Sequence, residues 1–142
     1  MHTEHLQNVR PSLVGTGWLI AVAVGSFAFL ALVALGLVSG DWADDAKFAA
    51  LAVAVGFGVG GFVAGFRAMH APILHGVAIG LTTLVAWVAL NLITVAVLEH
   101  ASWSALSPTA SGALLLEQIV AAVLGAWIGY TLALRGQPEP AD

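Results

Sequence analysis

The chain has no cysteine, a single tyrosine, and only four lysine and arginine residues among its 142 residues. The absence of cysteine excludes disulfides, a thiolate nucleophile and cysteine-ligated zinc or iron–sulfur sites. Because the net charge is −4 and basic residues are so few, no basic surface is available to attract nucleic acid. Charged residues make up only 8% of the sequence, which is too little to cover the surface of a soluble domain of this length.

Hydrophobic residues make up 60% of the chain, a composition typical of membrane proteins. They gather in four nearly uncharged stretches, and we expect helices over residues 14–38, 42–66, 73–98 and 108–134. Each stretch is close to the roughly 20 residues that cross about 30 Å of hydrocarbon. Bare backbone is costly in lipid and no β-barrel alternation is visible, so helices are favoured over strands. The sequence predicts an all-α fold: a polytopic integral membrane protein with four transmembrane helices in an antiparallel up-down bundle.

The distribution of basic residues predicts how this bundle is oriented. Lysine and arginine prefer the cytoplasmic loops of membrane proteins. Three of the four basic residues fall on one side of the predicted arrangement, namely Arg10, Arg67 and Arg135. We therefore expect a multi-pass protein of the cell membrane, with a cytoplasmic N-terminal segment at 1–13, a transmembrane domain at 14–134 and a cytoplasmic tail at 135–142.

Small residues recur along the predicted helices at spacings that place them on shared faces. Such faces let helix backbones approach closely in lipid, where little hydrophobic force acts between helices. The second helix carries two of these faces, which predicts a central position for it. The residues expected to mediate packing, in the manner of a glycine zipper, are Gly58, Gly61, Gly65, Gly76, Gly80, Gly125 and Gly129. They either close the chain's own bundle or support self-association or docking on a partner.

Several polar residues lie inside the predicted spans: Thr83, Asn91, Thr94, Glu117 and Gln118. The stripe that contains Thr83 and Asn91 also carries small residues, so we expect it to face the interior of the bundle. Glu117 is the only acidic residue inside a span, and intramembrane acids are often functional. Glu117 and Asn91 could share a polar layer; alternatively, Glu117 reaches the interface and Asn91 only holds helices together.

The sequence contains no recognisable nucleophile–base pair, phosphate-binding loop or metal-ligand cluster. We therefore predict no catalytic residue, no metal site and no cofactor, and we do not expect an enzyme. The acidic group Asp41, Asp44 and Asp45 is interpreted as a solvated turn in which Asp41 caps the next helix, in preference to a cation site. His70 and His75 are expected at the membrane interface.

A resemblance to a known family rests on two short segments. These are Gly60-Gly61-Phe-Val-Ala-Gly65, followed by Arg67 and Ala68, and Leu74-His75-Gly76-Val-Ala-Ile-Gly80. They resemble small four-helix membrane proteins of bacteria and archaea that we term YrzE-like. The resemblance implies a four-helix unit whose second and third helices are joined by a short basic loop. It carries over no catalytic or binding residue.

Two functional hypotheses follow. The first is a non-enzymatic membrane protein that acts through helix packing, as an accessory subunit of a larger membrane complex or as a self-assembling homo-oligomer in the lipid bilayer. The alternative is an oligomeric transporter or channel for a small solute or cation. It would use Glu117 and the polar face of the third helix, because four helices alone enclose little space.

Overall fold

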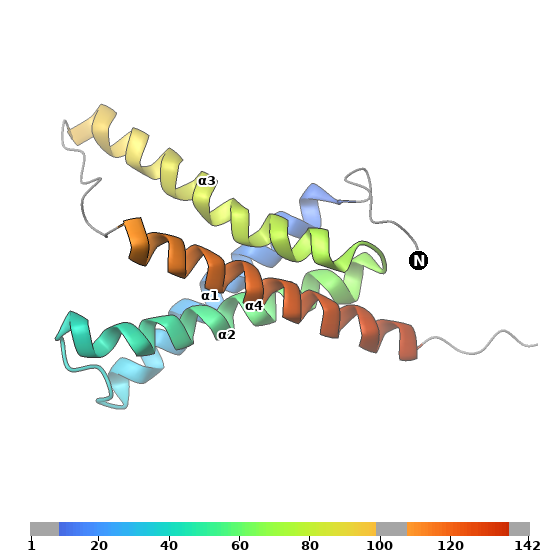
Figure 1. Cartoon of the computed structure of the whole chain (residues 1–142), viewed down its shortest axis with the longest axis horizontal. Helices are drawn as coiled ribbons and strands as arrows, with labels where there is room; N and C mark the ends of the chain where they lie inside the picture. The colour runs from blue at the N-terminus through green and yellow to red at the C-terminus, as the bar shows by residue number, and fades with distance from the viewer. Residues whose placement is uncertain (1–8, 99–107, 137–142) are drawn as a thin grey trace, which may run out of the picture.

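The structure is a computed structural model that describes residues 9–98 and 108–136. Its regular elements are four α-helices: α1 (Pro11–Ala34), α2 (Trp42–Ala68), α3 (Pro72–Leu98) and α4 (Pro108–Arg135). Figure 1 shows α2 and α4 side by side, with α1 and α3 packed around them. The prediction of an all-α fold with four helices is confirmed.

Each helix contains a segment that is long and apolar enough to cross a membrane. These segments are Pro11–Ala34, Asp45–Ala68, Pro72–Leu90 and Ser111–Arg135. The shortest has 19 residues, which at 1.5 Å per residue approaches the roughly 30 Å of a hydrocarbon core. Many large apolar side chains point outward in the described part of the chain, Phe27, Val85 and Leu116 among them. A surface of this kind suits a lipid environment better than water.

Local sequence explains where the helices begin and end. α1, α3 and α4 each begin with a proline, whose fixed φ and missing N–H suit the first helical position. α1 ends at Ala34, earlier than the residue 38 expected from hydrophobicity, because Gly36 adopts a left-handed φ of 71°. The N–H of Gly36 donates to Val33 and that of Leu37 to Leu32, which is the Schellman arrangement that closes a helix.

The α1–α2 loop is held by Asp45 in the first turns of α2. Its carboxylate accepts hydrogen bonds from the backbone N–H groups of Ser39 (2.9 Å) and Gly40 (2.6 Å) and from the Ser39 hydroxyl (3.1 Å). Asp41 directly precedes α2, at the position where a helix cap was expected. Asp45 is buried, so the expectation of a solvated acidic turn is wrong for this residue, which instead holds the loop between α1 and α2.

α2 is the central helix of the fold. It packs most extensively against α4 and α1 and also contacts α3. A β-carbon added at Gly56 or Gly60 would overlap the backbone of α1, whereas one added at Gly61 or Gly65 would overlap the backbone of α4. Glycines on two sides of α2 thus allow both neighbours to approach until the backbones touch.

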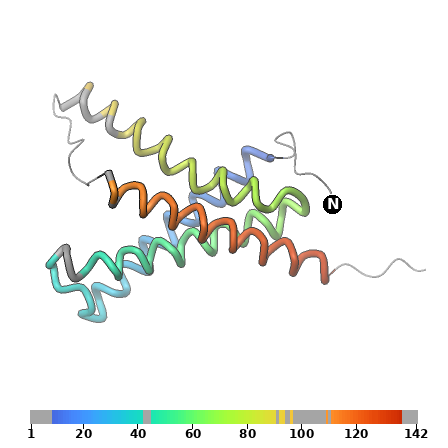
Figure 2. Tube along the Cα trace, viewed as in Figure 1, coloured from blue at the N-terminus to red at the C-terminus, as the bar shows by residue number. Residues whose placement is uncertain are grey.

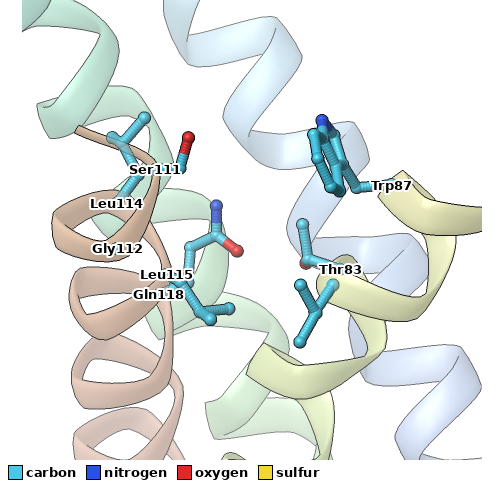
Figure 3. A pocket seen from close by; sticks show the side chains of 8 residues that line it. Thr83, Trp87, Ser111, Gly112, Leu114, Leu115 and Gln118 are labelled. Carbon is cyan, nitrogen blue, oxygen red and sulfur yellow. The ribbon is translucent and has the colours of Figure 1, made fainter. Parts of the chain in front are cut away.

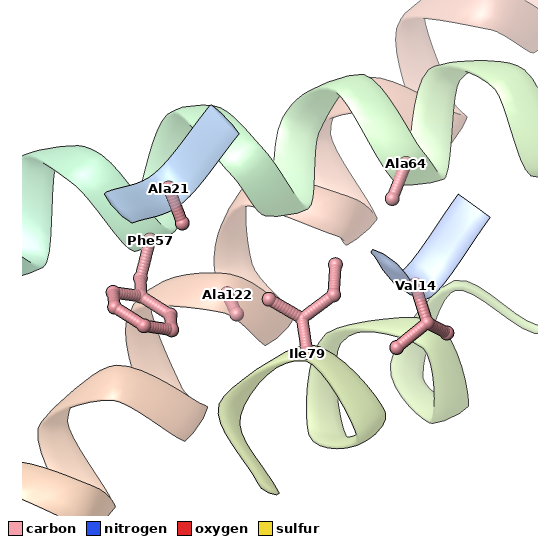
Figure 4. Packing of buried hydrophobic residues seen from close by; sticks show 6 residues of the cluster. All are labelled: Val14, Ala21, Phe57, Ala64, Ile79 and Ala122. Carbon is pink, nitrogen blue, oxygen red and sulfur yellow. The ribbon is translucent and has the colours of Figure 1, made fainter. Parts of the chain in front are cut away.

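Half of the residues in the buried core cluster are alanines, in keeping with this close packing. The cluster contains Val14, Ala21, Phe57, Ala64, Ile79 and Ala122 (Figure 4). Ile79 of α3 is fully buried, and a β-carbon added at Gly17 of α1 would collide with its side chain. Ile79 therefore fixes the first half of α3 against the core formed by α1, α2 and α4.

Candidate functional site

The second half of α3 separates from α4 and leaves a cleft. Near the start of α3, Gly76 lies against the backbone of Val123 and Gly80 lies against Ile119. Beyond Gly80, side chains on α3 are mostly exposed, and Figure 2 traces how α3 diverges from α4 toward its C-terminal end. The cleft between them has a volume of about 280 Å³.

The cleft has polar groups on both walls. Its lining residues are Thr83, Leu84, Trp87, Ser111, Gly112, Leu114, Leu115 and Gln118 (Figure 3). Thr83 comes from α3 and Gln118 from α4, so two of the five polar residues singled out from the sequence face one cavity. The volume is near the lower end of the roughly 300–1,000 Å³ found for small-molecule pockets.

Thr83 is held in place by a residue of α1. The indole Nε1–H of Trp18 donates a hydrogen bond of 3.0 Å to the Thr83 hydroxyl oxygen. Because the indole nitrogen can only donate, this bond uses an acceptor site of Thr83 and leaves the direction of the hydroxyl hydrogen to be set by another partner. No local sequence pattern signals this pairing, since 65 residues separate the two positions.

Gln118 presents an unpaired acceptor. Its side-chain carbonyl oxygen is buried and has no hydrogen-bond partner among the described residues. Figure 3 shows the amide projecting from α4 across the cleft in the direction of Thr83. A buried polar atom without a partner costs about 1–3 kcal/mol, and such an atom calls for an explanation in a native structure.

The side chain of Glu117 is described by the structure, whereas that of Asn91 is not. Glu117 is half-buried and does not line the cleft, since neighbouring positions on a helix point about 100° apart. The side chains of Asn91 and Thr94 lie outside the described residues. A polar layer shared by Glu117 and Asn91 therefore stays a prediction.

The glycines singled out from the sequence lie mostly at contacts within the chain. Gly61 and Gly65 face the backbones of Ala122 and Ala126. In return, Gly125 and Gly129 face the backbones of Gly58 and Phe62, so the α2 and α4 motifs share one interface. Gly58 differs from the others, because a β-carbon added there would meet nothing within 4 Å.

His75, expected at the membrane interface, is fully buried in the structure. Its Nδ1 lies 2.9 Å from the carbonyl oxygen of Ala71, and its Nε2 lies 3.1 Å from the backbone nitrogen of Arg10. A carbonyl can only accept and a backbone N–H can only donate, so this pairing requires the neutral ring with its hydrogen on Nδ1. His75 thereby joins the start of α3 to the start of α1. No local pattern signals this, because its partner is a distant backbone group.

Among residues 9–98 and 108–136, no group of three or more metal-ligating side chains lies close together. Comparisons with protein-family models, curated proteins and solved structures find no match to this chain. The resemblance to YrzE-like proteins stays a prediction, and the cleft must be interpreted from its own chemistry.

Proposed function

We propose that this protein is a polytopic integral membrane protein of the cell membrane, with four spans in an antiparallel up-down bundle and cytoplasmic termini. The four apolar helices support the spans. The placement of the connections supports the up-down order, because the α2–α3 connection and the end of α4 lie at one end and the α1–α2 loop at the other (Figure 1). The basic residues Arg10, Arg67 and Arg135 support the orientation.

Within the membrane, the protein acts without catalysis as an accessory subunit of a larger membrane complex. One observation carries this proposal. The glycine-rich faces of α2 and α4 are buried in contacts within the chain, whereas α3 leaves the bundle after Gly80 and keeps an uncovered face. Glycines already buried against α1 and α4 are not free to mediate self-assembly. The outward face of α3 is free to pack against a partner helix, with Val85 68% exposed at its centre.

Site-specific photo-crosslinking tests this proposal in native membranes. A crosslinking amino acid replaces Val85 on α3, and the matched control replaces Phe27 on α1, which is 73% exposed. We expect a discrete protein adduct from Val85 and a much weaker one from Phe27, with the partner recovered at fixed stoichiometry in mild detergent. Adducts to lipid alone at both positions would contradict the proposal, and a dimer of this chain would replace it by self-assembly.

A transporter or channel is the second candidate, and the cleft is the observation that favours it. Thr83 and Gln118 place polar groups on facing walls within two predicted spans. Glu117 supplies an acid on the same turn of α4, and intramembrane acids are natural groups for coupling protons or cations. Flux of protons and monovalent cations into vesicles should then fall in Glu117→Gln and Gln118→Leu variants. Equal flux with and without the protein would eliminate this candidate.

A further inference from the structure

The unpaired carbonyl oxygen of Gln118 indicates the chemical class of ligand that would fit the cleft between α3 and α4. This oxygen is buried, points across the cleft and accepts no hydrogen bond from the described residues. None of residues 9–98 and 108–136 supplies a donor to this oxygen. The Thr83 hydroxyl on the opposite wall accepts one hydrogen bond from Trp18, and its own hydrogen can still be donated to a second partner.

A hydroxyl group has the donor that Gln118 lacks and an acceptor that suits Thr83. It donates its hydrogen to the Gln118 carbonyl and offers its oxygen to the Thr83 hydroxyl. It would also satisfy the amide turned by 180°, because it can accept from the NH₂ group as readily as it donates to the oxygen. A charged headgroup does not fit, since no charged side chain lines the cleft and an unpaired charge in a low-dielectric site is very costly.

Apart from the Ser111 hydroxyl and the indole N–H of Trp87, the rest of the lining is apolar, and it lies within the predicted spans. Leu84 and Trp87 on α3 face Leu114 and Leu115 on α4. Leu84 and Trp87 are also partly exposed at the outer surface, so the cleft opens between helices toward the position of lipid. A ligand would therefore lay an apolar body along these side chains and enter from the bilayer.

We propose that the α3–α4 cleft binds an uncharged lipid that carries a free hydroxyl group, with Gln118 and Thr83 holding the hydroxyl. This inference goes beyond the accessory role and does not depend on it. The cleft uses the face of α3 that carries Thr83 and Trp87, whereas the partner surface is centred on Val85 on the opposite face. A failure of either proposal is visible separately, because one is measured by lipid binding and the other by protein crosslinking.

The test uses the full chain reconstituted in phosphatidylcholine vesicles. The probe is a long-chain fatty alcohol that carries a photoactivatable diazirine on its chain, and the comparison probe is its methyl ether. The ether keeps the chain and the acceptor oxygen, adds one methyl group and cannot donate to Gln118. We expect labelling of the alcohol to map to peptides of α3 and α4, with the ether bound about two- to tenfold more weakly, as befits one lost hydrogen bond.

Two variants separate binding from folding. Gln118→Leu removes the acceptor and should bring alcohol labelling down to the level of the ether. Gly112→Leu fills the cleft from a position where an added β-carbon meets nothing within 4 Å, so it should reduce labelling at least tenfold without disturbing the fold. The matched control is Gly15→Leu on α1, where an added β-carbon also meets nothing within 4 Å and labelling should stay unchanged.

Three results would overturn the proposal. Equal labelling by the alcohol and its ether would show that no hydroxyl is recognised. Labelling that survives Gly112→Leu would place the probe elsewhere on the surface. Labelling that stays at its full level in Gln118→Leu would mean that water alone serves the carbonyl oxygen.

Discussion

The two sides of α4 differ in how completely they are packed. Toward α2, glycines bring backbones together and leave no room for a β-carbon at Gly61, Gly65, Gly125 or Gly129. Toward α3, contact ends near Gly80 and gives way to a cleft with an unpaired polar group. Tight packing needs small residues on both partners, and α3 has no glycine beyond Gly80. We infer that the first side holds the fold and the second is available for function.

The largest expected effect comes from a pair of glycine substitutions on α2. Gly61→Ala places a β-carbon against the backbone of Ala122 and should destabilise the protein by about 3 kcal/mol, the upper range for overpacking. Gly58→Ala, three residues earlier, meets open space and should be neutral or slightly stabilising, because alanine favours helix. Unfolding by sodium dodecyl sulfate in mixed micelles measures the free energy of unfolding of both variants. Equal destabilisation would mean that the contact between α2 and α4 at Gly61 is not especially close.

Loss of His75 should have the next largest effect. His75→Ala leaves the backbone N–H of Arg10 without its acceptor and empties a buried position, which should cost about 1–3 kcal/mol. The neighbouring His70 is only half-buried, so His70→Ala serves as the control and should cost little. The same unfolding assay applies. Similar losses for both variants would show that the Arg10 contact contributes nothing.

The hydrogen bond between Trp18 and Thr83 should contribute less. Trp18→Phe keeps an aromatic ring but removes the indole donor, and hydrogen bonds between membrane helices average about 0.6 kcal/mol. Thr83→Val removes the same bond from the other side. In a double-mutant cycle, the second substitution should add little to the first, whereas fully additive losses would mean that the bond is not formed in the membrane.

The smallest effect should have the opposite sign. Gln118→Leu removes a buried acceptor without a partner and should stabilise the lipid-free protein by up to about 1 kcal/mol. Thr131→Val on the same helix is the control, because the Thr131 hydroxyl already donates to the carbonyl of Ile128. Thermal unfolding in detergent compares the two variants. A clear loss of stability in Gln118→Leu would show that the amide is paired and the cleft is filled.

Sequence reasoning works well where the relevant signal is local. Long apolar runs indicated four helices, and the two small-residue faces of α2 correspond to its contacts with α1 and α4. The early end of α1 was not anticipated, because hydrophobicity continues past Gly36 while its left-handed φ stops the helix.

Contacts between distant segments account for what the sequence did not reveal. His75 binds a backbone group of Arg10, which has no side-chain signature. Gln118, and not its neighbour Glu117, lines the cleft, because a rotation of about 100° per residue decides which side chain faces α3. Composition identifies the residues of a span, but it does not determine how the helix is rotated about its axis relative to its partner.

The most direct test of the contrast between the two sides of α4 is a pair of distance measurements by spin labelling in lipid bilayers. The absence of native cysteine allows labels to be placed without background. One labelled pair, Val59 and Leu124, spans α2 and α4, and the other, Leu84 and Leu115, spans the cleft. We predict a narrow distance distribution across α2 and α4 and a broader one across the cleft, which a hydroxyl-bearing lipid narrows. Equally narrow distributions that no lipid changes would contradict an open, ligand-accepting cleft.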